Sequence, residues 1–232
     1  MKPPPEKHDS HLMRRMFSFI APRYDFVTRT LSFGMDRRWK REAVAQAALP
    51  QNAVVLDLAC GTGDFSQLIM QSSPDSTAIG VDLTEGMLHL ARSRGLRDVL
   101  CGDVARLPFS DASFDCVFIG YGLRNFPQLQ CALAEICRVT RPGGKIVSLD
   151  FFLPKNAAFR ELYLAWLFAQ GALWGLILHG RPRTYTYIPH SLRNFTSIDG
   201  LSSLLGHTGY EKVQARSYIF GGIGVHCATK RS

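Results

Sequence analysis

The stretch VVLDLACGTGDF at residues 54–65 constrains the fold of this chain more than any other. Residues 54–58 form a short run rich in β-branched and aliphatic side chains, which is typical of a strand buried on both faces of a parallel sheet. The run stops before Gly61 and Gly63, which can adopt backbone angles that a Cβ forbids and leave room for a ligand. Residues 65–70 (FSQLIM) then predict a helix. A strand, a glycine turn and a helix in this order are where open α/β sheets bind nucleotides.

The spacing of the glycines separates two classes of ligand. A dinucleotide fingerprint, G-x-G-x-x-G, needs a third glycine three positions after Gly63, and Ser66 stands there. A nucleoside without a pyrophosphate therefore fits better. The pattern D-x-A-C-G-T-G resembles the first motif of the class I methyltransferases, whose S-adenosylmethionine sits on this turn. From these residues alone, an NAD-dependent enzyme remains the alternative.

Composition limits the architecture to one domain with a substantial core, because the chain has 232 residues of which 46% are hydrophobic. The net charge of +8 indicates a solvated basic surface, a nucleic-acid partner or an anionic membrane. Arginines are densest at residues 14–41, among apolar side chains, and this pattern suits RNA and lipid equally.

The cysteine pattern and the N-terminus indicate a cellular compartment. None of the six cysteines forms a C-x-x-C pair, so we expect free, mostly buried thiols in a reducing compartment and no metal site. Residues 1–11 lack the apolar segment of a signal peptide and predict a disordered tail. The expected location is the cytoplasm, with peripheral contact to the inner membrane face left open.

Strand and helix patterns alternate along most of the chain. Strands are predicted at 54–58, 77–83, 98–104, 114–120 and 145–151, with helices from 65, from 84 and at 129–139, and a tight turn at 141–144. Helices at 12–20 and 37–49 form a helical N-terminal cover over residues 12–50. A helix at 197–206 precedes a hairpin of strands 211–219 and 224–229. The predicted fold is a Rossmann-like, doubly wound α/β domain spanning 1–232, with a mostly parallel sheet and a C-terminal antiparallel hairpin.

The most apolar segment, residues 162–178, lies in a predicted lid or substrate insertion at 152–196. It falls just short of a membrane-spanning run and contains Gln170, Gly171 and Gly175, which argues against a spanning helix. We expect a lid or a helix that touches the membrane surface, and an ordinary core helix is the alternative.

Separate stretches resemble the UbiE/COQ5 family of quinone-ring C-methyltransferases. Tyr24-Asp25, LSFG at 31–34 and Arg38-x-Lys40 around Trp39 are similar to its N-terminal signature. The sequence GLRN at 122–125 resembles its loop after the fourth strand, and residues 138–144 with Asp150-Phe151 resemble its second signature. Residues 185–193 match its substrate-side segment more loosely. The resemblance covers nearly all of the chain after residue 12.

The resemblance implies a binding site for S-adenosylmethionine. An acidic residue at the end of the second strand, Asp82, is also spaced from the glycine turn as a ribose ligand would be. Asp103 can accept a hydrogen bond from the adenine amino group. Two residues depart from the family pattern. Gly120 stands where family members often have Ser, and Asp36 stands where they often have His. The expected donor-binding residues are Asp57, Gly61, Thr62, Gly63, Asp82, Leu83, Met87, Asp103, Val104 and Gly120.

Methylation at carbon requires alignment of an electron-rich ring carbon with the sulfonium methyl group, and removal of a phenolic proton. Arg124 remains protonated, so we expect it to stabilise phenolate or to orient a water, with Asn125 fixing the ring oxygen or the methionine carboxylate. Tyr24 and Asp25 are expected to close over the donor, an ordinary turn being the alternative. His190 is an alternative base, although a lone histidine beside Pro189 is more often structural.

The implied substrate is a prenylated quinol of menaquinone or ubiquinone biosynthesis, with benzoquinol and naphthoquinol both open. The alternatives are a methyltransferase for another small phenol, a thiol or RNA, and a donor-binding domain without catalysis. No RNA-recognition module is evident, so no nucleic-acid partner is expected. The presence of Arg124 and Asn125 favours catalysis, and a homodimer is left open.

Overall fold

A single twisted sheet organises the computed structural model, which describes residues 10–232. Within these residues the sheet has seven strands in the order β3-β2-β1-β4-β5-β7-β6. The first five in this order are parallel, and β7 runs antiparallel to both of its neighbours. The strands are β1 (Val54–Leu58), β2 (Thr77–Asp82), β3 (Val99–Cys101), β4 (Phe114–Gly120), β5 (Thr140–Phe151), β6 (Tyr210–Tyr218) and β7 (Ile223–Lys230). This topology confirms the predicted mostly parallel sheet with a C-terminal hairpin.

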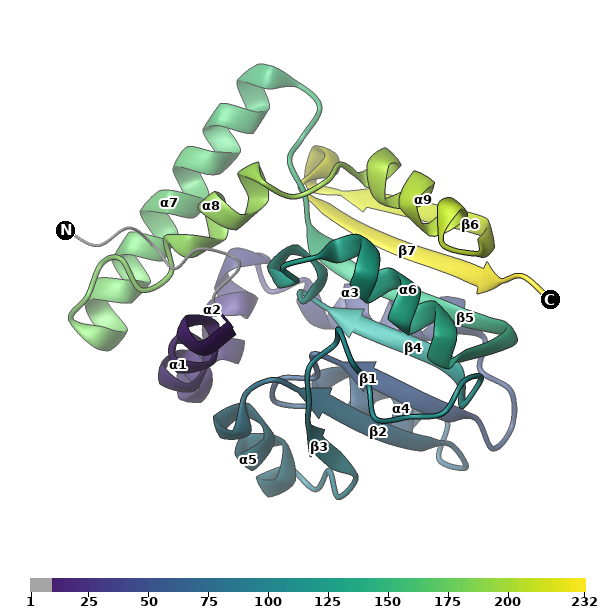
Figure 1. Ribbon diagram of the computed structural model, residues 1–232. Coiled ribbons are helices and arrows are strands. Elements are labelled where there is room, and N and C mark those ends of the chain that lie inside the picture. The colour runs from purple at the N-terminus through teal and green to yellow at the C-terminus, as the bar shows by residue number, and fades with distance from the viewer. Residues whose placement is uncertain (1–9) are drawn as a thin grey trace.

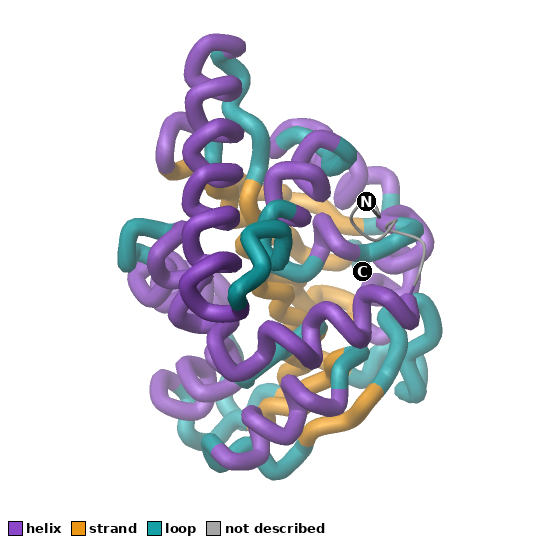
Figure 2. The backbone as a smooth tube through the Cα atoms, turned by 90° about the vertical axis from the view of Figure 1, so that its left-hand side faces the viewer, coloured by secondary structure: helices purple, strands orange, loops and turns teal. Residues whose placement is uncertain are grey.

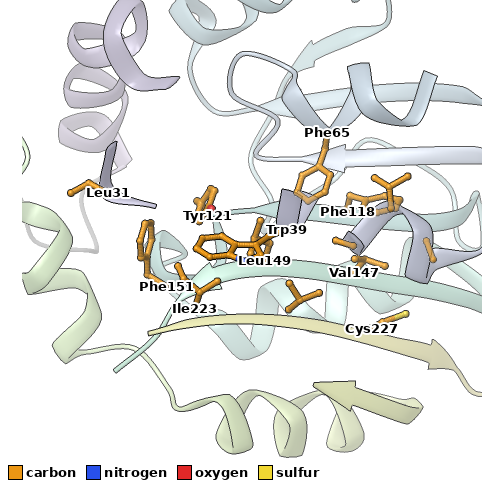
Figure 3. Close-up of a cluster of buried hydrophobic side chains, with 14 of the residues drawn as sticks. Leu31, Trp39, Phe65, Phe118, Tyr121, Val147, Leu149, Phe151, Ile223 and Cys227 are labelled. Carbon is orange, nitrogen blue, oxygen red and sulfur yellow. The ribbon is translucent and has the colours of Figure 1, made fainter. Parts of the chain in front are cut away.

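Helices cover both faces of the sheet, because alternate strand residues point to opposite sides. Val55 and Phe118 pack with α3 and α4 on one face, whereas Leu56 and Val117 pack with α6 and α9 on the other. Figure 3 shows the first of these cores, with Phe65 of α4 beside Phe118 of β4. The helices are α1 (Ser10–Ile20), α2 (Tyr24–Leu31), α3 (Asp36–Ala47), α4 (Asp64–Ser72), α5 (Glu85–Ser93), α6 (Leu129–Val139), α7 (Ala157–His179), α8 (Tyr187–Arg193) and α9 (Ile198–His207).

Most element boundaries agree with the sequence, and three differ for identifiable reasons. The strand expected at 98–104 ends at Cys101, so Asp103 lies in the following loop, where its Oδ1 accepts from the amide of Ala105. The expected turn at 141–144 is a bulge inside β5, since Phe114 and Cys116 pair with Thr140 and Lys145. Tyr24 and Asp25 begin a helix, α2, rather than a turn.

The expectations for the N-terminal tail and the cysteines have different outcomes. Residues 1–9 of the expected disordered tail lie outside the described residues, and α1 already begins at Ser10. All six thiols are free, as expected. Cys101 and Cys131 are exposed, however, because they lie on an edge strand and on the outer side of α6, so only half of the cysteines are buried.

The N-terminal helices and the 152–196 segment gather at one end of the sheet. Figure 1 shows α1, α2, α7 and α8 together at the end where the parallel strands finish. Figure 2, which looks onto that side, shows these helices in front of the strands. In α/β folds ligands bind at the carboxyl ends of the strands. The arrangement therefore forms a roof over the place where a ligand is expected.

Helix α7 runs without interruption for 23 residues, beyond both ends of the apolar run noted in the sequence. Within residues 10–232 it is the one helix that is long and apolar enough to cross a membrane, judged by length and composition. Gly171 and Gly175 pack closely on the following loop: a Cβ at Gly175 would lie 2.6 Å from the carbonyl oxygen of Arg181. The close approach at these two glycines packs one side of α7 against the backbone of the loop that follows it.

Candidate functional site

A pocket at the carboxyl ends of β1, β2 and β4 brings together most of the residues expected to bind the donor. Its wall includes Asp57, Gly61, Thr62, Asp82, Leu83, Met87, Asp103, Val104 and Gly120. Tyr24, Asp25 and Asn125 also line it, whereas Arg124 and Gly63 do not. The cover adds to this wall, because Met13 and Phe17 of α1 and Thr28 of α2 also line the pocket. The cover therefore closes a site that the sheet alone would leave open.

The carboxylate of Asp82 holds the glycine turn in place. Its Oδ2 accepts from the amide of Gly61 at 2.9 Å, and its Oδ1 accepts from the amide of Thr84 at 2.8 Å. Burial raises the pKa of Asp82, and the hydrogen bonds from Gly61 and Thr84 oppose that shift. Gly61 has a φ of +55°, and open space lies where its Cβ would be. A ribose in this space would meet an oriented acceptor.

Two further glycines act through packing. Gly63, at φ +85°, lies under Leu96, whose Cδ2 would be 2.9 Å from a Cβ at this position. Gly120 lies under the ring of Phe65, 2.8 Å from where its Cβ would stand. The Phe65 ring therefore occupies the space that the side chain of a serine at position 120, frequent in the family, would need.

Asp57 fixes the start of α4. Its Oδ2 accepts from the amide of Ser66 at 2.9 Å and from the Ser66 hydroxyl at 2.6 Å. Burial raises the pKa of Asp57 to about 7, against the effect of these two hydrogen bonds. Asp57 therefore shapes the turn while one side of it borders the pocket.

Arg124 lies behind the pocket wall, where the carboxylate of Asp150 neutralises its charge. Its Nη1 donates to Asp150 Oδ1 and to the carbonyl oxygen of Tyr121, each at 2.6 Å, and its side chain is 2% exposed. Burial lowers the pKa of Arg124, but Asp150 more than offsets this, so the net shift is upward. Burial raises the pKa of the Tyr187 phenol, and the charge of Arg124 acts in the opposite direction.

Tyr24 is near enough to Arg124 for its phenol to be affected by the positive charge. Tyr24 lines the pocket, and burial raises its pKa to about 12, while the charge of Arg124 acts in the opposite direction. Any influence of Arg124 on a bound molecule therefore passes through its neighbours.

Unpartnered polar atoms mark where a ligand would bind. The Oδ1 of Asn125 is buried without a hydrogen-bond partner, while its Nδ2 donates to the carbonyl oxygen of Tyr121 at 3.3 Å. Buried acceptors normally have a donor, so this atom suits a hydroxyl or an ammonium group of a ligand. With the Asp82 turn and the space at Gly61, the residues fit S-adenosylmethionine.

Several residues of the site were missed in the sequence. Tyr121 lines the pocket beside Asn125, and Asp150 pairs with Arg124 from β5. Arg94, at the end of α5, reaches Asp25. Asp150 lies within a family-like stretch and had a signal, Tyr121 directly precedes one, and Arg94 had none. His190 is exposed on α8 and is absent from the pocket wall.

Comparison with known proteins agrees with this geometry. The model of the ubiE/COQ5 methyltransferase family matches residues 6–230. A demethylmenaquinone methyltransferase of Deinococcus radiodurans is 38% identical over 226 residues, covering 94% of this chain and 92% of its own. The ubiquinone/menaquinone biosynthesis C-methyltransferase UbiE of Geobacter sulfurreducens is 38% identical over 218 residues, covering 90% and 84%.

The fold is also found in solved structures. An S-adenosylmethionine-dependent methyltransferase of Thermotoga maritima aligns with a TM-score of 0.63 at 21% identity, covering 94% of this chain and 99% of that one. At this identity the likeness concerns the fold.

Proposed function

Because the chain belongs to the ubiE/COQ5 methyltransferase family, we propose that it methylates a ring carbon of a prenylated quinol of the demethylmenaquinol type. It is an S-adenosylmethionine-dependent methyltransferase, and the donor supplies a methyl group activated on a sulfonium. Relatives with names that include ubiquinone keep a benzoquinol as the second candidate substrate.

The observation that supports this proposal is the unpartnered Oδ1 of Asn125 beside aromatic walls. Phe17, Tyr24, Tyr121 and Phe126 line the same pocket, which therefore offers aromatic surface to a flat ring with one hydroxyl on Asn125. A fixed hydrogen bond to a ring hydroxyl orients the ring, and orientation lowers the barrier of a two-reactant step. Donor-binding and ring-binding residues thus share one pocket.

Arg124 takes a positioning role in this proposal. It holds Tyr121 through its carbonyl oxygen, and its positive charge acts on the phenols of Tyr24 and Tyr187. We assign stabilisation of the developing phenolate to the hydroxyl of Tyr24, which can donate a hydrogen bond, and orientation of the neutral ring hydroxyl to Asn125 Oδ1, which can only accept one. Arg124 fixes the loop that carries Asn125. Asp25 is assigned to the closed position of α2 over the donor.

Product analysis tests the proposed reaction. Purified protein is incubated with labelled S-adenosylmethionine and reduced short-tail demethylnaphthoquinols and benzoquinols, and the products are analysed by mass spectrometry. We expect a C-methylated naphthoquinol and a marked loss of turnover in Asn125→Ala. Methylation of benzoquinols alone would support the second candidate, and no quinol product at all would contradict the proposal.

We also propose that the enzyme reaches its substrate at a membrane surface. Large apolar side chains are exposed along α7, among them Leu162 at 66%, Ile177 at 59% and Phe168 at 52%. Phe26 and Phe33 extend this surface onto the cover, where they contact Trp174 and Trp166 at centroid distances of 4.9 and 4.6 Å. We call the exposed apolar side chains of α7 with Phe26 and Phe33 the apolar face.

The apolar face suits a helix that lies on the bilayer rather than one that spans it. The packing of Gly171 and Gly175 on the following loop would be lost in a spanning helix. Arg14, Arg15, Arg23 and Arg181 are exposed on the cover and after α7, where they can meet anionic head groups at about 1 kcal/mol each. The exposed arginines and the apolar face together support the proposed membrane contact.

Vesicle sedimentation tests the apolar face. We expect the protein to pellet with anionic vesicles at low salt, and Phe168→Ser with Ile177→Ser to abolish this. Leu100→Ser is the matched control, because Leu100 is exposed on β3, away from α7. Trp166 and Trp174 are less suitable for substitution, because a phenylalanine ring packs on each and leaves it half-buried. A stable dimer that the double variant dissociates, without vesicle binding, would reassign the face to a second copy.

A further inference from the structure

A chain of charged groups joins the cover to the glycine turn. Asp25 of α2 accepts from the Thr62 hydroxyl at 2.7 Å and from Arg94 Nη2 at 2.5 Å. Arg94 Nη1 lies 3.4 Å from Asp64 Oδ1 and 3.5 Å from the carbonyl oxygen of Thr62. Lys40 of α3 lies 2.7 Å from Asp64 Oδ2. Two cover helices are thereby linked to the turn that carries the donor site.

The same groups separate the donor pocket from a second, polar cavity. Asp25, Lys40 and Asp64 line both cavities, and Arg94 lines only the second. The polar cavity is also lined by Arg29, Arg37, Gln67 and Gln71. The ion pairs therefore form part of the wall between the donor pocket and this polar cavity.

Arg94 joins the cover to the turn from the side of the polar cavity. It follows α5, a helix that also packs on α1 of the cover, and contacts one carboxylate of the cover and two groups of the turn. Its side chain is 36% exposed, and those of Asp25 and Asp64 are 25% and 31% exposed. Half-exposed ion pairs are weak and are screened by salt, which suits a contact that must open in every turnover.

We propose that Arg94 is a positioning residue that latches the cover over the bound donor, and that the demethylated donor leaves where this latch opens. The proposal rests on the proposed function, since that function assigns the donor to this pocket. When the latch is closed, Asp25 and Thr62 are fixed at the turn. When it opens, α2 moves away from the turn and the wall between the two cavities is interrupted.

Three variants test the latch. Arg94→Ala removes the bridge, and Arg94→Lys keeps the charge without the second contact. Arg92→Ala is the matched control, because Arg92 lies in the last turn of α5, two residues before Arg94, and its one ion pair among the described residues is with Glu85 at 2.5 Å. S-adenosylmethionine affinity and the dissociation rate of S-adenosylhomocysteine are measured without quinol, from low salt to about 0.5 M.

We expect Arg94→Ala to speed S-adenosylhomocysteine dissociation roughly 3- to 10-fold and to remove most of the salt dependence of donor affinity. Arg94→Lys should restore part of both, Arg92→Ala should match the wild type, and the KM for quinol should not change. Hydrogen exchange in α2 should become faster in Arg94→Ala with thermal stability retained.

Wild-type affinity, dissociation rate and salt dependence in Arg94→Ala would overturn the latch. A loss of stability with unchanged salt dependence would do the same, because it would show a structural contact only. A wild-type protein that binds no donor would instead overturn the proposed function, so the two failures are distinguishable.

Discussion

The carboxyl group of Asp57 is 1% exposed, and burial raises its pKa to about 7. An unfolded aspartate has a pKa near 3.9, so the folded protein binds the proton more strongly between these values. The stabilising contribution of protonated Asp57 is therefore full below about pH 4 and is lost as pH rises through about 7. At higher pH the structure holds a buried, ionised carboxylate.

Asp57→Asn should remove this pH dependence, because an amide oxygen can still accept from Ser66 and carries no charge. We expect the variant to equal the wild type at or below about pH 4 and to exceed its free energy of unfolding by on the order of 4 kcal/mol near pH 8. Denaturant unfolding at a series of pH values measures the difference. A constant difference across the range would show that Asp57 keeps an ordinary pKa.

At Gly120 the limit on substitution is the space beside Phe65 and not an electrostatic effect. A side chain at this position would overlap the Phe65 ring at 2.8 Å, so Gly120→Ser should lower the free energy of unfolding by about 1–3 kcal/mol. Gly206→Ala, in α9 with no atom within 4 Å of the added Cβ, should be neutral or stabilising by about 0.5–1 kcal/mol. Chemical denaturation of both variants measures this. Equal stability of Gly120→Ser and wild type would mean that Phe65 moves freely.

At the scale of elements, one ion pair joins the loop after β4 to the end of β5. Asp150 Oδ1 accepts from Arg124 Nη1, and its Oδ2 accepts from the Arg124 amide at 3.2 Å. The guanidinium also lies 5.3 Å from the Phe151 ring centroid. The short helix η2 (Leu123–Asn125), which carries Asn125, depends on this pair for its position.

Arg124→Ala should therefore destabilise the protein, because it leaves Asp150 buried without its partner. Breaking a buried pair costs about 3–5 kcal/mol, and thermal or denaturant unfolding measures it. Replacing both partners in Arg124→Met/Asp150→Leu should restore much of the stability while turnover stays low. A fully stable Arg124→Ala with lost turnover would instead place Arg124 in direct contact with the reaction.

Local patterns predicted the elements better than the contacts between them. The strands at 54–58 and 114–120 and the helix at 129–139 have the predicted boundaries, because buried aliphatic runs and flanking glycines are local signals. The pairing of Arg124 with Asp150 and the reach of Arg94 to Asp25 join distant segments. Such contacts depend on the packed sheet, so no local pattern reports them.

At the scale of the whole molecule, donor binding should raise the free energy of unfolding of the whole sheet. The pocket takes residues from the cover, from β1 and β2, and from the loop after β4, so unfolding of any of these removes the site. A ligand that binds only the folded chain stabilises it by about 2.7 kcal/mol at 100 times its Kd. Thermal stability can therefore report the donor without a quinol.

We expect saturating S-adenosylmethionine to raise Tm by roughly 5–10 °C, and NAD to leave it unchanged, because the turn lacks the third glycine of a dinucleotide site. In Asp82→Ala the loss of a charge-assisted hydrogen bond to the ribose should weaken the donor by about 1.5–3 kcal/mol. The ligand-induced shift should then fall to about half or less at the same donor concentration. Because each shift is measured against the variant without ligand, any loss of turn stability cancels. Asp75→Ala, at an exposed site outside the pocket, should keep the full shift. An undiminished shift in Asp82→Ala would move the ribose contact to another residue, and a shift with NAD would reopen the dinucleotide alternative.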